Sequence, residues 1–398
     1  MFSDRAKIAR FALYLFMFSI NFEVFNLLGD SGAFSVGRLT GFIYIGAFFY
    51  ANYRVSFYRL NYLLFALLAF FVVIVVSSSF HLNYLSDRII DFSLLQNIVL
   101  FFILLTHERY EPGVLNKSIY GFALGTITLS VSYLLGIGIQ YEGGRLSLFG
   151  DNANIIGIRM AISSILLLYS LILSDIKITG NNVLILISTS LMIYLMIESS
   201  SRVAFISFIG MLFFMMLLYL SVNPLKRLFP TLILSGLLLY FLVPYILSND
   251  LLINRLFDSK EGDLAGREDI WFYYMPSVWR SIIFGYGFSG FDEVSMGIFG
   301  VTASPHNVII EVFLYGGFVA FAFYLWFNVQ VFFISLRMYS IKKEFIGLLL
   351  LIPYLGCVLS AQVLQSKIMW FILAFNCIAI LEETPKEQHS ISSLPLIH

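Results

Sequence analysis

Residues 60–79 read LNYLLFALLAFFVVIVVSSS, a stretch without a single charged side chain. A bilayer core about 30 Å thick is crossed by roughly 20 apolar residues in a helix, so this stretch predicts a transmembrane span. Similar stretches recur along the chain between short polar breaks, and they predict an all-α polytopic membrane protein. We expect about twelve transmembrane helices, near residues 11–29, 37–52, 60–79, 89–106, 117–137, 154–174, 182–198, 203–221, 228–247, 307–335, 345–363 and 367–382.

The overall composition favours the same class. Of 398 residues, 59% are hydrophobic and 12% are charged, against roughly 25% charged residues in an ordinary soluble domain. The chain has too little polar surface to cover a soluble core, which excludes a soluble enzyme and a disordered regulator. Lys and Arg number 24, as do Asp and Glu, so no net positive charge attracts nucleic acid.

The cysteines and histidines form no recognisable metal or redox motif. Cys357 and Cys377 lie in apolar runs, without a Cys-x-x-Cys motif and without a histidine nearby. We interpret them as small buried apolar residues and expect neither a disulfide nor a zinc site. The histidines are scattered along the chain, so we expect no metal and no cofactor.

The orientation in the membrane follows from the basic residues, which gather on the cytoplasmic side of membrane proteins. With a cytoplasmic N-terminus, the short outer loops hold only Arg38, Arg88, Arg145, Arg202 and Lys367. An even number of spans then places both termini in the cytoplasm, and we interpret the first span as a retained anchor. The inner segments hold Arg5, Lys7, Arg10, Arg54, Arg59, Arg109, Lys117, Lys177, Lys226, Arg227, Arg337, Lys342, Lys343 and Lys386.

Residues 248–306 form the only long loop, and it is far more polar than its flanks. A loop longer than about 15 residues is usually functional or disordered, and its aromatic content argues against disorder. Its middle, 266–284, has apolar residues at helical spacing and predicts an amphipathic helix. We expect transmembrane helices 1–9 in 1–247, this outer loop in 248–306, helices 10–12 in 307–382 and a cytoplasmic tail in 383–398.

The first outer feature is the sequence ESSSR at 198–202, a very short turn between the seventh and eighth spans. Arg202 stands at the start of the eighth span. It is either an interfacial arginine whose long side chain reaches water or a buried cation that awaits an anion.

The second feature is GREDIW at 266–271, which leads to Gly285-Tyr286-Gly287. Arg267 and Trp271 are four residues apart and therefore share one face of a helix. A guanidinium group binds phosphate bidentately, and an indole ring stacks on the apolar face of a sugar. The alternative is an ordinary surface helix in which Arg267 pairs with Asp263 or Asp269.

The third feature is SPHN at 304–307, which runs directly into an apolar helix. Proline suits a helix start, so His306 is expected at the outer membrane surface, where an imidazole can transfer a proton near neutral pH. Asn307 and Glu311 share one helical face. Glu311 lies about a turn inside the span, where it needs a partner, and Asn307, Arg202 and His306 are the candidates. The alternative for His306 is a helix-start histidine bonded to backbone.

The fourth feature precedes the sixth span and consists of GGR at 143–145 and GDNAN at 150–154. Arg145 stands in this loop, and Arg159 lies about a turn and a half inside the span. A polar loop with a capping Asn or Asp explains it equally well. Elsewhere the chain lacks a Walker-type phosphate loop, an Asp-x-Asp motif and HExxH, which argues against ATP-driven transport, a metal–nucleotide transferase and a zinc protease.

In this order, the four features resemble the O-antigen polymerase and O-antigen ligase superfamily of bacterial inner-membrane proteins. Matching motifs cover roughly 140–320, and elsewhere only hydropathy agrees. The matching residues are Gly144-Arg145, Asn154, Ser201-Arg202, Arg267, Trp271, Gly285-Tyr286-Gly287, His306-Asn307, Glu311 and Gly316-Gly317.

The resemblance implies a glycosyltransferase that uses an undecaprenyl-diphosphate-linked oligosaccharide at the periplasmic face of the inner membrane. It implies inversion at the sugar, with no metal and no nucleotide. Arg202 and Arg267 would hold the diphosphate, and His306 would act on the acceptor hydroxyl. A chain-length regulator and a flippase are the implied partners besides the lipid bilayer. The implied substrate-binding residues are Trp271, Asn307, Glu311, Arg145, Arg159 and Tyr286.

Two activities fit the resemblance. A polymerase joins repeat units to one another, whereas a ligase transfers the glycan to lipid A–core. Glu311 after His306-Asn307 is more similar to polymerases, and polymerases of capsule or exopolysaccharide fit equally well. A transporter or flippase of lipid-linked sugars is the alternative from another class. Transporters usually show charged or broken helices near the midplane, whereas the polar residues here gather on one outer side.

Overall fold

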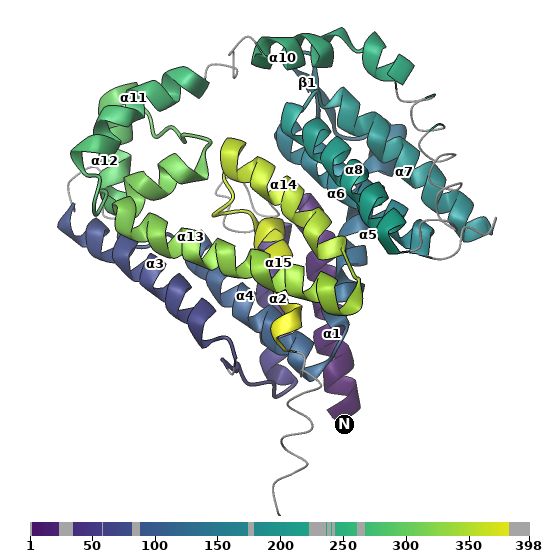
Figure 1. The fold of residues 1–398 in the computed structure, drawn as a ribbon, viewed down its shortest axis with the longest axis horizontal. Helices are drawn as coiled ribbons and strands as arrows, with labels where there is room; N and C mark the ends of the chain where they lie inside the picture. Colours follow the sequence, from purple (N-terminus) through teal and green to yellow (C-terminus); the bar gives the residue numbers. More distant parts are fainter. Residues whose placement is uncertain are drawn as a thin grey trace, which may run out of the picture.

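The computed structural model describes residues 2–23, 35–57, 59–81, 88–173, 179–222, 236, 240, 243–260 and 267–381. These residues are mainly helical (Figure 1). The long helices are α1 (Phe2–Ser19), α2 (Val36–Tyr50), α3 (Asn61–Phe80), α4 (Phe92–Tyr110), α5 (Val114–Leu134), α6 (Ala153–Leu173), α7 (Gly180–Glu198), α8 (Arg202–Val222), α13 (Val308–Lys342), α14 (Ile346–Ser360) and α15 (Lys367–Asn376). Short 3-10 turns, η1 (Ile20–Phe22) and η2 (Ile378–Ile380), follow α1 and α15.

The helices agree with the hydropathy of the sequence. Every predicted span overlaps one of these long helices, except 228–247. Most of that span lies outside the described residues. By length and composition, five described helices can cross a bilayer, namely α3, α6, α7, α8 and α13. The helices α2, α14 and α15 are apolar but shorter. A helical membrane protein is therefore confirmed, and the number of twelve spans stays a prediction.

An antiparallel hairpin between α5 and α6 corrects the all-helical expectation. Strand β1 (Ile139–Glu142) pairs with β2 (Arg145–Leu148), with Glu142 opposite Arg145. The two turn residues, Gly143 and Gly144, have φ values of 57° and 77°. A two-residue turn of this kind needs positive φ at both positions, which glycine adopts without strain. The Gly-Gly pair was noted as part of a polar loop, and its hairpin signal was missed.

The segment 248–306 is largely helical. The predicted helix at 266–284 is present as α11 (Arg267–Arg280), and its end before Gly285 agrees with the sequence. Two further helices, α10 (Asp250–Lys260) and α12 (Gly287–Phe299), were not predicted. In Figure 1 the hairpin and α10 to α12 lie along the upper margin, away from the N-terminus at the bottom. We call the upper margin the hairpin end.

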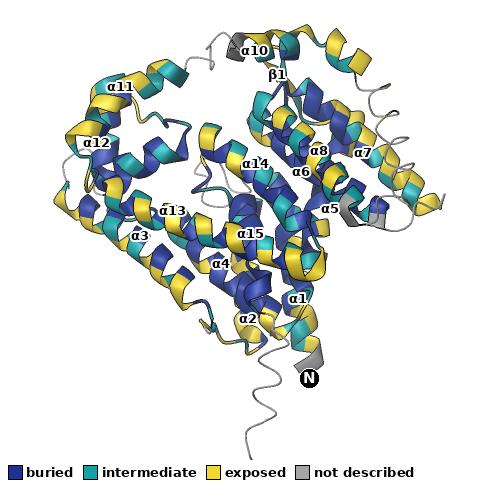
Figure 2. Ribbon diagram, in the orientation of Figure 1, coloured by how far each residue is buried: buried dark blue, intermediate teal, exposed yellow. Residues whose placement is uncertain are grey.

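The apolar core lies between two groups of helices. α6 packs against α5, α7, α8 and α14, and α13 packs against α3 and α14. Of the spanning part of α6, 89% is buried inside the protein, whereas the buried share is 39% in α3 and 33% in α7 and α8. Figure 2 shows the same division, with dark blue in the centre and yellow on the outer helices. Exposed apolar helix faces of this kind suit contact with lipid.

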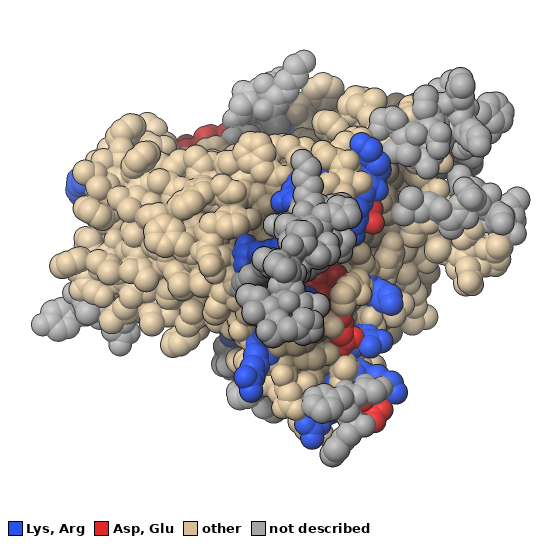
Figure 3. Space-filling view, turned by 60° about the horizontal axis from the view of Figure 1, so that its bottom comes forward, with Lys and Arg blue, Asp and Glu red and all other residues tan. Residues whose placement is uncertain are grey.

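Charged side chains are unevenly distributed over the face drawn in Figure 3. Most of them gather in one zone, and the broad flank to its left is nearly free of charge. An uncharged flank is the surface that a bilayer core requires. Several helix ends carry the basic residues that the sequence assigns to the inner side, namely Arg5, Lys7, Arg10, Arg54, Arg59, Arg109, Arg337, Lys342 and Lys343.

A break in α13 holds the segment that joins α11 to α12. Gly317 has a φ of 61° inside α13, and the Phe318 N–H donates to Ile282 O at 2.7 Å across the break. The Tyr286 N–H donates to Leu314 O, also at 2.7 Å. A Cβ atom on Gly317 would lie 2.3 Å from the Ile283 carbonyl carbon. The glycines at 285 and 316–317 therefore allow two backbones to touch, which fixes α11 and α12 on α13.

Candidate functional site

Arg145 links the hairpin to the turn between α7 and α8. Its Nε donates to Ser199 O at 3.1 Å, and its guanidinium also donates to Asn154 Oδ1 at 2.7 Å. Ser199 belongs to the predicted ESSSR turn, in which α7 ends at Glu198 and α8 begins at Arg202. The first and fourth features, the ESSSR turn and the loop that forms the hairpin, therefore meet in space.

Arg202 brings in a residue that the sequence analysis did not single out. Its guanidinium donates to the backbone oxygen of Arg255, in α10, at 3.1 Å. α10 is held at this place by further contacts with the end of α7. The Tyr245 hydroxyl donates to Glu198, and Asn249 Nδ2 donates to Ile197 O at 3.5 Å.

These arginines lie close enough to one another to interact electrostatically. The pKa of Arg145 is lowered to about 10, mainly by burial and further by the charges of Arg255, Arg267 and Arg202. Burial also lowers the pKa of Arg267, with Arg202 and Arg255 acting in the same direction. The four guanidinium groups of Arg145, Arg202, Arg255 and Arg267 form what we call the arginine cluster.

Acidic groups act on two members of the arginine cluster. Glu142 acts on Arg145, and Glu268 acts on Arg267, each raising the pKa of its arginine by less than the other causes lower it. Arginine stays protonated at physiological pH even with such shifts. A partly buried group of like charges is unfavourable until an anion joins it, so the cluster is suited to bind one.

His306 lies next to this cluster. Burial lowers the pKa of its imidazole below the ordinary value, and the nearby Arg267 charge lowers it further. The neutral imidazole therefore predominates at pH 7 and is able to accept a proton. The backbone of His306 has a φ of 48°, and its N–H donates to Ser304 Oγ at 3.1 Å. A non-glycine residue in this conformation is uncommon and is often found at functional sites.

Trp271 joins α11 to the segment that carries His306. Its indole Nε1 donates to Pro305 O at 2.8 Å. Arg267 and Trp271 both belong to α11, as the four-residue spacing predicts. Since the indole N–H already has a protein partner, Trp271 positions His306 beside Arg267, and only its ring face is left for a sugar.

Two residues that are predicted to bind substrate make structural contacts. Asn307 caps α13, because its Oδ1 accepts the N–H groups of Ile309 and Ile310 at 3.0 and 3.2 Å. Tyr286 donates its hydroxyl to Ser277 O at 3.0 Å and fixes α12 through its backbone. The motifs around both residues are explained by helix capping and backbone packing.

Arg159 makes structural contacts as well. It is buried, and its guanidinium forms an ion pair with Asp151 and donates to Asn21 O at 3.2 Å. This contact ties α6 to the end of α1. The part of Arg159 in substrate binding stays a prediction.

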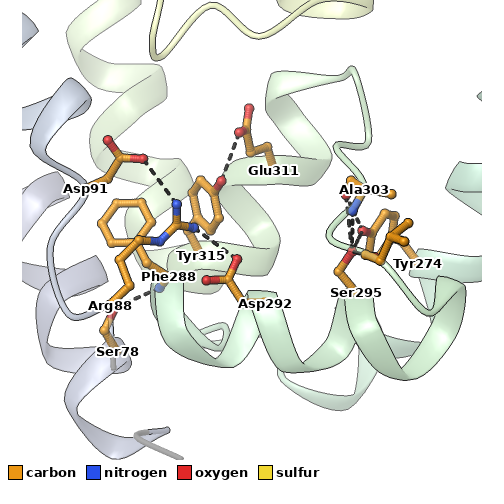
Figure 4. Close-up of polar contacts among 11 residues, drawn as sticks. Ser78, Arg88, Asp91, Tyr274, Phe288, Asp292, Ser295, Ala303, Glu311 and Tyr315 are labelled. Carbon is orange, nitrogen blue, oxygen red and sulfur yellow. Dashed lines mark hydrogen bonds and ion pairs between the residues drawn. The ribbon is translucent and has the colours of Figure 1, made fainter. Parts of the chain in front are cut away.

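Glu311 is buried in the first turn of α13, but its partners are not the predicted ones. Its Oε1 accepts the Tyr315 hydroxyl at 3.0 Å, as Figure 4 shows. The Gln365 side chain approaches the same carboxyl group, and Arg88 and Asp91 are its charged neighbours. The expected pairing with Asn307, Arg202 or His306 is therefore wrong.

The comparison with known families covers this region. Residues 187–325, about a third of the chain, match the model of a family described as O-antigen ligase. The match includes Arg202, Arg255, Arg267 and His306, whereas Arg145 precedes it. No curated protein shows significant similarity to the chain. The predicted resemblance to the O-antigen polymerase and ligase superfamily is confirmed over 187–325.

Proposed function

We propose that this protein is an O-antigen polymerase, or a polymerase of a related surface polysaccharide. It would join undecaprenyl-diphosphate-linked repeat units at the periplasmic face of the bacterial inner membrane. The observation that carries the proposal is the arginine cluster, whose four guanidinium groups stand next to the neutral imidazole of His306. The match to the O-antigen ligase family supports it.

The proposed reaction exchanges one bond at the anomeric carbon of the donor. The bond from this carbon to the diphosphate oxygen breaks, and a bond to the acceptor hydroxyl oxygen forms. The leaving diphosphate gains negative charge, which Arg202 and Arg267 stabilise together with Arg145 and Arg255. His306 takes the proton of the acceptor hydroxyl, which is otherwise a poor nucleophile. This assignment uses only side chains of the chain itself.

The same site fits an O-antigen ligase, and the description of the matching family favours that alternative. The two activities differ in the acceptor. A strain that lacks a polymerase caps lipid A–core with single repeat units. A strain that lacks a ligase accumulates lipid-linked polymer and exposes bare core. The polysaccharide pattern of a deletion strain therefore distinguishes them.

The diphosphate assignment is tested by replacing its arginines. Arg267→Ala is expected to abolish chain extension while the protein stays in the membrane. Arg202→Lys is expected to be damaging as well, because lysine does not reproduce a bidentate contact with phosphate. The measurement is the ladder of chain lengths on a polysaccharide gel.

The matched control is Arg280→Ala, at the exposed end of the same helix. It removes one arginine from α11 without touching the arginine cluster, and we expect a normal ladder. Full-length ladders from both Arg267→Ala and Arg202→Lys would disprove the diphosphate assignment.

A further inference from the structure

Two arginines from distant parts of the sequence line one hollow at the end of the molecule opposite the hairpin end. Arg59 stands two residues before α3, and Arg337 lies near the end of α13. The hollow measures about 400 Å³, and the polar side chains of Asn61 and Tyr62, at the start of α3, also line it. We call it the Arg59–Arg337 pocket.

The pocket forms because α3 and α13 run side by side in opposite directions (Figure 1). At the break in α13, a Cβ atom on Gly316 would lie 3.1 Å from Ile74 in the later half of α3. Farther from the break, the rings of Phe65 and Trp326 pack with their centroids 5.8 Å apart. Continued in the same direction, this packing brings the start of α3 to the last turns of α13.

The pocket lies about one bilayer thickness from the break. Arg337 follows Gly316 by 21 residues in the sequence, which corresponds to about 30 Å of helix, the thickness of a bilayer core. The break itself holds the segment between α11 and α12, at the hairpin end. Arg337 is therefore placed at the opposite membrane surface, and its side chain is exposed there.

The charge of the pocket favours an anion. Its described lining residues include the two arginines and no Asp or Glu. Arg337 forms neither a hydrogen bond nor an ion pair within the described part of the chain. The start of α3, with the apolar Leu60 at its N-cap, adds the positive end of a helix dipole to the two guanidinium groups. Guanidinium groups bind phosphate oxygens bidentately.

The rest of the lining is apolar, which distinguishes a lipid from a soluble anion. One turn farther into the membrane, Phe65 on α3 and Phe333 on α13 are 55% and 60% exposed. A phospholipid carries a phosphate beside acyl chains, so it matches the polar and apolar parts together, whereas a free phosphate would leave the apolar part unused. The apolar lining residues are Ile334, Ala379 and Ile380.

We propose that the Arg59–Arg337 pocket binds the headgroup of an anionic phospholipid. The phosphate lies between the two guanidinium groups, and the acyl chains follow the exposed apolar faces of α3 and α13. Basic pockets between transmembrane helices are suited to such headgroups. A zwitterionic phospholipid binds more weakly, because its ammonium group is repelled by the arginines. The proposal does not depend on the proposed function, since the pocket and the arginine cluster lie at opposite ends of the molecule.

The test measures lipid binding to the full-length chain, so that the acidic residues Glu382 and Glu383 are present. Purified protein in an uncharged detergent is titrated with phosphatidylglycerol or with phosphatidylethanolamine, and bound lipid is counted by native mass spectrometry. Wild type is expected to bind phosphatidylglycerol more tightly. Arg337→Gln is expected to weaken this binding about fivefold, and the double variant with Arg59→Gln about 25-fold, the loss for one and two arginine contacts to an anionic lipid.

Arg54→Gln is the matched control. Arg54 is an exposed arginine at the same end of the molecule, between α2 and α3, and it does not line the pocket. We expect this variant to bind phosphatidylglycerol as wild type does. Because Arg337 is exposed, its single variant keeps the test open if the double variant fails to fold.

Four outcomes would overturn the proposal. Wild type that does not prefer phosphatidylglycerol, or Arg337→Gln with wild-type affinity, would show that the pocket is not an anionic lipid site. Equal losses in Arg54→Gln and Arg337→Gln would show a general effect of charge at this end of the protein. Inorganic phosphate that displaces the lipid at an equal concentration would make the pocket a site for a soluble phosphate.

Discussion

At the scale of single residues, the protonation state of His306 is the quantity on which the proposed reaction depends. Burial and the Arg267 charge both disfavour the imidazolium form and so lower the pKa of His306 below its ordinary value. A base must be unprotonated to act, and a lowered pKa extends the active range toward acid. The transfer rate is therefore expected to fall with acidification at a lower pH than it would for a histidine with the ordinary pKa of about 6.5.

The matching variant is His306→Asn, which keeps a polar side chain but cannot serve as the base. Its transfer rate should fall by roughly 100-fold or more, the usual contribution of a general base. Donor binding should be retained, because the arginine cluster is unchanged. A variant that reacts at the normal rate with a normal pH profile would remove His306 from its assigned role.

At the scale of elements, the contact between the break in α13 and the segment before α12 holds the site together. Gly317→Ala places a side chain on backbone with a φ of 61° and a ψ of −159°, a region essentially limited to glycine, which costs about 1–3 kcal/mol. The new Cβ also meets the backbone of Ile283 at 2.3 Å. We expect a lower Tm for this variant in detergent and a loss of chain extension, because α11 carries Arg267.

Gly297→Ala is the control for this contact. Gly297 lies inside α12, and an added Cβ would meet nothing within 4 Å. Alanine in a helix interior is favoured over glycine by roughly 0.5–1 kcal/mol, so its Tm should stay the same or rise. Equal behaviour of the two variants would show that the packing of α13 against residues 282–286 is unimportant.

The helices of the membrane part could be predicted because each is encoded locally by a run of apolar residues. Arg267 and Trp271 on α11 followed from their spacing for the same reason. Arg255 could not be recognised, since nothing in the run 250–260 distinguishes it from a surface arginine. The bond from Arg202 to its backbone helps to bring it to the cluster. Asn307 was assigned to substrate although its Oδ1 is used by the helix that it begins.

At the scale of the whole molecule, the proposed function requires the hairpin end to face the periplasm. The basic residues of the sequence predict this orientation, and labelling of single cysteines tests it.

Cys357 and Cys377 are buried and would be replaced first. Ser248→Cys, just before α10, and Ser340→Cys, near the end of α13, are both exposed. A membrane-impermeant maleimide added to cells with a permeabilised outer membrane should label the first variant and not the second. After the inner membrane is opened, both should react equally. The reverse pattern would place the arginine cluster in the cytoplasm, where a donor presented in the outer leaflet cannot reach it.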